Sequence, residues 1–175
     1  RTISEESKGG QLEFLLTAPV TDGAVILGKH LAVVVFLSVL WAVVPIYGLT
    51  LELLGVSPDW GQMALGYLGA VLVSALFSAL GMVASALSST PLLAAFLGFI
   101  FNIALLVLPM GAGSLGGTVG RALNALAGKL DVLTHLQLSF MRGALDSADV
   151  IFFLAWTGLF LFAATRIVEG RRMWS

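Results

Sequence analysis

The feature that most constrains this chain is a long stretch without acidic or basic side chains. Residues 60–120 contain no Asp, Glu, Lys, Arg or His. A soluble fold must present part of any such stretch to water, and here it would have no charge to present. Over the whole chain 58% of residues are hydrophobic and 11% are charged, whereas globular chains average about 45–50% apolar and about 25% charged residues. The composition predicts an integral membrane protein.

Four apolar runs are long enough to cross a bilayer, whose core of about 30 Å needs roughly 20 helical residues. We expect membrane-spanning helices at residues 24–51, 62–88, 91–109 and 149–168. Thr21 is a candidate N-cap for the first helix, and Asp22 suits the positive end of its dipole. Pro45 should kink this helix, because proline lacks the backbone N–H. The predicted fold is therefore all-α: one polytopic helical bundle over residues 1–175, with about four transmembrane helices.

The second span carries a stripe of small residues at roughly four-residue spacing. Small side chains let two helix backbones approach closely in lipid, so the stripe predicts helix packing. Its members are Gly66, Ala70, Ser74, Ser78, Gly81 and Ser85. Lining of a substrate path by the serines is the alternative interpretation. For Asn102, in the third span, we expect a hydrogen bond to a neighbouring helix, with contact to cargo as the alternative.

Residues 111–148 differ from the four spans because they are too polar to cross the membrane. The segment opens with the glycine-rich sequence GAGSLGG and then becomes amphipathic, with apolar residues at helical periodicity. These residues are Val119, Leu123, Leu126, Leu130 and Leu133. The pattern fits either a helix lying in the membrane interface or a re-entrant pair that enters the membrane and returns on the same side.

The distribution of cations predicts the orientation. Four spans place both ends of the chain on one side of the membrane. That side holds six of the nine Lys and Arg residues, namely Arg1, Lys8, Lys29, Arg166, Arg171 and Arg172. The opposite side holds Arg121, Lys129 and Arg142. The positive-inside bias therefore predicts that both ends are cytoplasmic. We expect the membrane to be the cell's inner (plasma) membrane.

Catalytic motifs are missing from the sequence. It contains no GxxxxGK[ST] phosphate loop, no HExxH, no GxSxG and no cysteine. We expect His30 to be an interfacial residue and His135 to be a polar residue of the amphipathic segment, not metal ligands. No expected span holds a carboxylate that could pair with another, which argues against acid–base catalysis and against a proton-driven carrier. We predict no enzyme activity, no cofactor and no metal, and the net charge of -1 disfavours nucleic acid as a partner.

Residues 1–23 form a polar loop that contains one short apolar patch. Leu12, Leu15 and Leu16 lie on one face of a short helix, Glu13 lies elsewhere on it, and Pro19 ends it. Such a helix buries little within its own chain. Periodicity leaves two interpretations open, a docking patch for a partner protein or an anchor in the lipid headgroups.

Residues 1–32 resemble the cytoplasmic loop of ABC-2-type transporter permeases. The pattern there is roughly Arg-x-Ile-x-Glu-Glu, a Gly-Thr-Leu-Glu-x-Leu-Leu-Thr-x-Pro-Val core and a Gly-Lys pair entering the next span. The matching residues are Arg1, Ile3, Glu5, Glu6, Gly10, Leu12, Glu13, Leu15, Leu16, Thr17, Pro19, Val20, Gly28 and Lys29, whereas Gln11 stands where Thr is usual. The similarity continues at Asp59, residues 66–72 and 85–99, His135, Phe140, Arg142, Gly143, Asp146, Arg171 and Arg172. The subgroup most similar to this chain is the gliding-motility-type ABC permease.

The resemblance implies a transporter subunit that is driven by a separate ATPase subunit. Such permeases have six spans, with this loop between the second and third, so the chain would lack the first two spans. The loop would carry a coupling helix that docks on an ABC ATPase subunit through Leu12, Glu13, Phe14, Leu15 and Leu16. Two permease copies or homologues and two ATPases would form an exporter surrounded by membrane lipid.

Two functions of other classes compete with this interpretation. A non-transporting membrane scaffold or assembly protein would use the same stripe and loop for association alone. An intramembrane enzyme would need catalytic groups inside the spans, and the sequence offers only scattered Ser and Asn102 there.

Overall fold

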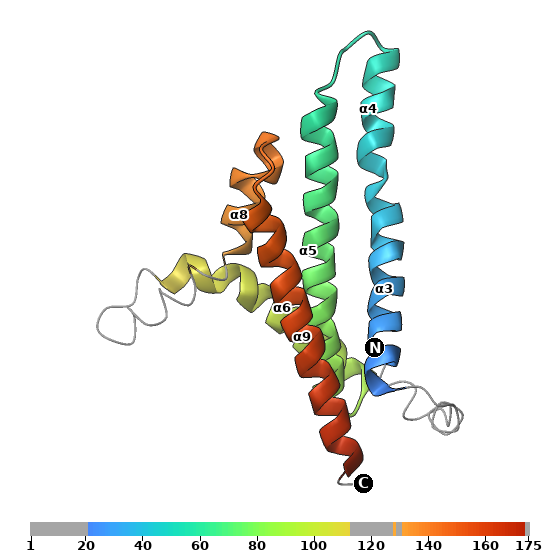
Figure 1. Cartoon of the computed structure of the whole chain (residues 1–175), viewed down its shortest axis with the longest axis vertical. Coiled ribbons are helices and arrows are strands. Elements are labelled where there is room, and N and C mark those ends of the chain that lie inside the picture. The colour runs from blue at the N-terminus through green and yellow to red at the C-terminus, as the bar shows by residue number, and fades with distance from the viewer. Residues whose placement is uncertain (1–20, 113–127, 129–130, 174–175) are drawn as a thin grey trace.

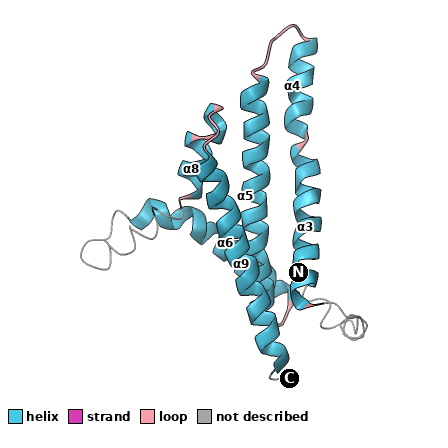
Figure 2. Ribbon diagram, viewed as in Figure 1, coloured by secondary structure: helices cyan, strands magenta, loops and turns pink. Residues whose placement is uncertain are grey.

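The computed structural model describes residues 21–112, 128 and 131–173, and this part of the chain is helical without strands (Figures 1 and 2). The elements are α3 (Asp22–Trp41), α4 (Val43–Leu53), α5 (Trp60–Leu87), α6 (Pro91–Ala112), α8 (Val132–Leu138), the short 3-10 helix η1 (Phe140–Arg142) and α9 (Ser147–Met173). Four helical segments are long and apolar enough to cross a membrane: Asp22–Leu53, Trp60–Leu87, Pro91–Gly111 and Ser147–Arg171. The prediction of an all-α bundle with four membrane-spanning helices is confirmed.

Local sequence explains where the helices begin. Thr21 caps α3, since its hydroxyl oxygen accepts a hydrogen bond from the Ala24 N–H at 3.3 Å. Asp59 caps α5 in the same way through the Gln62 N–H at 3.0 Å. Pro91 occupies the first position of α6, where its missing N–H costs nothing.

Pro45 interrupts the first span, as its sequence position predicts. Helix α3 ends at Trp41 and α4 begins at Val43, with Ala42 between them at φ -60° and ψ -11°. Proline at position 45 cannot donate to the carbonyl of Trp41, and its ring crowds that carbonyl. The opening of the helix one turn before Pro45 is the direct result.

Helix α5 is the centre of the bundle, and α3, α6 and α9 pack around it (Figure 1). One core cluster joins α5 to α6, α8, η1 and α9; its members are Leu72, Leu76, Leu80, Leu105, Val132, Phe140 and Phe153. A second cluster joins α5 to α3 and α9; its members are Ile26, Ala79, Met82, Ala86, Leu161 and Ala164. Both clusters depend on α5, so this helix organises the fold.

The start of α3 and the end of α9 lie at the same end of the bundle (Figure 1). At that end the Arg171 guanidinium donates to the carbonyl oxygens of Leu87 at 2.6 Å and Ser88 at 3.4 Å. These carbonyls belong to the last turn of α5, where no helical N–H can reach them and where a cation is favoured by the helix dipole. Arg171 therefore fixes the end of α9 to the end of α5.

The described part of the polar segment 111–148 folds back against α5. Gln62 Nε2 donates to the Met141 carbonyl at 2.7 Å, near the start of α5. Further along α5, Gly69 lies against Phe140 and Leu136: a Cβ on this glycine would lie 2.8 Å from Phe140 Cβ and 2.9 Å from Leu136 Cδ1. Helix α8 and η1 thus run beside about 10 Å of α5, at 1.5 Å per residue. The choice between an interfacial helix and a re-entrant pair stays a prediction, because residues 113–127 and 129–130 lie outside the described part.

Candidate functional site

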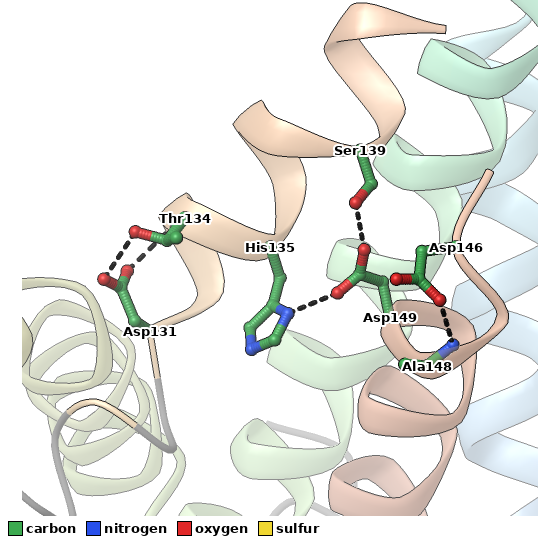
Figure 3. Close-up of polar contacts among 7 residues, drawn as sticks. All are labelled: Asp131, Thr134, His135, Ser139, Asp146, Ala148 and Asp149. Carbon is green, nitrogen blue, oxygen red and sulfur yellow. Dashed lines mark hydrogen bonds and ion pairs between the residues drawn. The ribbon is translucent and has the colours of Figure 1, made fainter. Parts of the chain in front are cut away.

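The most concentrated polar site in the described structure joins α8 to the first turn of α9 (Figure 3). Both oxygens of the Asp149 carboxylate are engaged. His135 Nδ1 bonds to Asp149 Oδ1, and the Ser139 hydroxyl donates to Asp149 Oδ2. His135 comes from α8, Ser139 directly follows α8, and Asp149 belongs to α9. We call these three residues the polar clasp.

Two further aspartates hold the helices that carry the clasp. Asp131 caps α8, accepting hydrogen bonds from the Thr134 N–H at 3.0 Å and from the Thr134 hydroxyl at 2.6 Å (Figure 3). Asp146 accepts from the Ala148 N–H at 2.9 Å at the start of α9. Short acidic side chains at these positions satisfy N–H groups that have no partner within the helix.

A left-handed turn aims η1 back toward α9. Gly143 ends η1 with φ 75°, a conformation that side chains with a Cβ rarely adopt. Its position also brings the backbone against α5, since a Cβ here would lie 3.5 Å from Gln62 Cα. This glycine allows the chain to reverse between the two helices that the clasp connects.

Aromatic rings close the apolar side of the clasp. The His135 imidazole stacks on Phe152, with ring centroids 4.1 Å apart and planes at 21°. Phe153, fully buried, meets both Phe152 and Phe140 edge to face. Asp149, the acceptor of the His135 hydrogen bond, is only 7% exposed. The clasp is therefore a polar site next to a cluster of aromatic side chains.

The order of contacts limits the chemistry that the clasp can perform. A serine nucleophile needs its hydroxyl hydrogen-bonded to the base that removes its proton. Here the carboxylate lies between the two groups, so Ser139 donates to Asp149 and not to His135. Among the residues whose positions are described, no group of three His, Cys, Asp or Glu side chains could hold a metal ion. The arrangement is suited to holding charge and protons.

The clasp was only partly visible in the sequence. His135 was expected to be a polar residue of the amphipathic segment, but it is hydrogen-bonded to a buried partner on another element. The spans were expected to hold no pair of carboxylates; a single carboxylate, Asp149, is nevertheless buried in the first turn of the last spanning helix. The His-x-x-x-Ser spacing, which places both side chains one helical turn apart, is the signal that could have indicated a shared acceptor.

A second group of polar contacts connects α3 to α5. The Trp41 indole N–H donates to Ser74 Oγ at 2.9 Å, and Ser78 Oγ lies 2.8 Å from His30 Nδ1. His30 was expected at the membrane interface, but it is 5% exposed and lies two turns inside α3. Ser74 and Ser78, both in the predicted small-residue stripe, therefore face α3.

The other members of the stripe have different surroundings. Gly81 faces α6, where its Cα would lie 3.9 Å from a Cβ on Gly98. Ser85 is buried, Ala70 is half-buried, and a Cβ on Gly66 would meet nothing within 4 Å. The tightest packing at a glycine of α5 occurs at Gly69, against the side chains of Phe140 and Leu136, and Gly69 lies outside the predicted stripe.

Asn102 lies on α6 and is half-buried. Its Oδ1 atom is fully buried and has no hydrogen-bond partner. The expected hydrogen bond from a neighbouring helix to this oxygen is therefore not formed in the described structure. The predicted ATPase-docking residues Leu12, Glu13, Phe14, Leu15 and Leu16 all lie outside the described residues.

Comparison with known proteins identifies no relative of this chain. No protein-family model matches it, and neither the curated proteins nor the solved structures contain a significant match.

Proposed function

We propose that this chain is the membrane-spanning permease subunit of an ATP-driven exporter of the ABC-2 type. The observation that carries the proposal is the opening loop, whose Arg-x-Ile-x-Glu-Glu and Leu-Glu-x-Leu-Leu-Thr-x-Pro-Val sequence resembles the coupling loop of such permeases. The four membrane-spanning helices are compatible with it. The chain contains no phosphate loop, so energy would come from a separate ATPase subunit.

The arrangement of the bundle is consistent with this role. The loop precedes α3, and α3 begins at the same end of the bundle where α9 finishes (Figure 1). By the topology expected from the sequence, six of the nine Lys and Arg residues belong to this side, which we assign to the cytoplasmic face of the cell's inner membrane. The ATPase would push on residues 10–17, and the movement would pass into α3. Only a difference in ATP affinity between inward-open and outward-open states could drive the cycle.

The test changes one apolar residue of the docking patch. In the complete protein, co-expressed with the ATPase encoded in the neighbouring reading frame, Leu15→Glu should reduce co-purified ATPase about tenfold or more. The expected size follows from losing the burial of one leucine, worth roughly 1.5–3 kcal/mol. Ser7→Glu is the matched control, because it adds the same charge to the same loop but outside residues 10–17.

Three results decide the proposal. Loss of ATPase binding with Leu15→Glu, but not with Ser7→Glu, supports docking through the leucines. Equal binding by the original protein and both variants contradicts it. A neighbouring region without any phosphate-loop ATPase favours the scaffold alternative, since a scaffold needs no nucleotide-hydrolysing companion.

A further inference from the structure

The buried carboxylate of Asp149 needs a compensating charge. Its side chain is 10% exposed, and it lies in the first turn of a membrane-spanning helix. Ionisable side chains in such places are costly, and they usually pair with one another or mark functional sites. The hydrogen bond from Ser139 reduces this cost but brings no charge. The positive end of the α9 dipole supplies about half an elementary charge.

The surrounding elements offer one full positive charge to this carboxylate. Helix α6 contains no acidic or basic residue, and the only ionisable side chain of α5 is Tyr67, whose hydroxyl donates to the Ser38 carbonyl on α3 at 3.0 Å. Asp131 and Asp146 are occupied with capping α8 and α9, and Arg142 is exposed. Within the described part of the chain, the cation able to reach Asp149 is protonated His135.

We propose that the polar clasp is a proton-binding site that controls how firmly α8 and η1 are held on α9. An ionised carboxylate can only accept hydrogen bonds, so Nδ1 of His135 carries a proton whenever Asp149 is charged. A second proton on Nε2 makes the ring cationic and neutralises the pair.

The side chains of His135 and Asp149 differ in exposure. The side chain of His135 is 31% exposed, against 10% for Asp149. In the proposed site the imidazole is therefore the group that exchanges protons, because it lies nearer the surface of the chain than the carboxylate does. At high pH, loss of the second proton would keep the Nδ1 hydrogen bond to the carboxylate but remove the positive charge of the ring. At low pH, protonation of Asp149 would remove the negative charge of the carboxylate. The attachment of α8 and η1 to α9 should therefore be strongest at intermediate pH, where His135 is cationic and Asp149 is ionised.

This proposal does not depend on the permease function. It is tested by hydrogen–deuterium exchange of the complete protein in lipid nanodiscs, corrected for the intrinsic effect of pH on exchange. Histidine normally changes charge between about pH 5 and 8. Across that range, protection of the α8 amides should fall about five- to tenfold as pH rises, because an ion pair becomes a hydrogen bond from a neutral ring to the carboxylate. Amides of α5 at residues 76–80 serve as the internal reference.

Two variants separate the proton site from ordinary packing. In His135→Gln, the amide can still donate to Asp149 but does not titrate, so α8 protection should stay within about twofold over the same pH range. In Asp149→Asn, protection should be lower than in the original protein below neutral pH and should lose its pH dependence. Constant α8 protection in the unmodified protein, or an unchanged pH dependence in His135→Gln, would overturn the proposal. The pH series on the unmodified protein decides the matter even if a variant fails to fold.

Discussion

The first two spans, α3 with α4 and then α5, are neighbours in the bundle, but they differ in how much of their surface is buried inside the chain. In the most apolar part of α5, 50% of the residues are buried inside the chain, against 6% in the span formed by α3 and α4. Helix α5 contributes to both core clusters, whereas α3 contributes Ile26 alone to the buried core. Side-chain hydrogen bonds from Trp41 and Tyr67 supplement the contact of α3 with α5.

The difference teaches what apolar residues do in a bilayer. Lipid tails are as apolar as leucine, so an exposed apolar face is not driven against another helix. Val35, Phe36 and Val39 on α3 are each more than half exposed. Close fit, and not hydrophobicity, therefore decides which helix is central, and substitutions in the two regions should have unequal effects.

The largest effect should follow truncation of a buried ring beside α5. Phe140 is fully buried between α5 and α9, and Phe140→Ala should lower the free energy of unfolding by about 3 kcal/mol. This is the low end of the usual range for aromatic truncation, because lipid solvates the ring in the unfolded state. Phe36→Ala, at a ring that is 63% exposed on α3, is the matched control and should change little. The free energy of unfolding would be measured by denaturant titration in micelles. Equal losses in Phe140→Ala and Phe36→Ala would contradict the proposed difference between α5 and α3.

A smaller effect should follow the addition of one methyl group to α5. Gly69→Ala places a Cβ 2.8 Å from Phe140 Cβ, an atom too close to the backbone to move aside freely. We expect a loss of about 1–3 kcal/mol from overpacking, measured by the same titration.

Gly66→Ala provides the control on the same helix. Its Cβ meets nothing within 4 Å, and alanine is the better helix former by about 1 kcal/mol, so stability should be unchanged or slightly higher. If Gly66→Ala were the more damaging change, the predicted stripe, and not the position of Phe140, would define the packing face.

The smallest effect should come from the contact between α3 and α5. Ser74→Ala removes the acceptor of the Trp41 indole N–H and should cost about 0.6 kcal/mol, the average for hydrogen bonds between membrane helices. The Trp41 indole proton should also shift upfield in NMR spectra. Ser57→Ala in the exposed loop should do neither. A loss as large as that of Phe140→Ala would show that α3 is held as firmly as α5.

Sequence reasoning predicted features that arise from local chemistry. The span positions follow from uninterrupted apolar composition, the cap at Thr21 from its hydroxyl, and the break before Pro45 from the missing N–H. None of these requires knowledge of which helices are neighbours.

The features that sequence reasoning missed depend on distant partners. The role of Gly69 requires Phe140, which lies far along the chain, and the burial of Asp149 requires His135 and Ser139 to return against α9. The small-residue stripe likewise could not reveal that Ser74 and Gly81 would face different helices. Periodicity assigns a residue to a face, but it does not say what covers that face.

The opening at Ala42 divides the first span into two rods with different attachments. On the N-terminal side of Ala42, α3 is hydrogen-bonded to α5 through His30 and Trp41. On the C-terminal side, α4 packs against α5 where Gly48 meets Met63. Bending an ordinary helix stretches a peptide hydrogen bond, but Pro45 has already removed the bond at this joint. Bending the first span at this joint therefore stretches one backbone hydrogen bond fewer than bending it elsewhere.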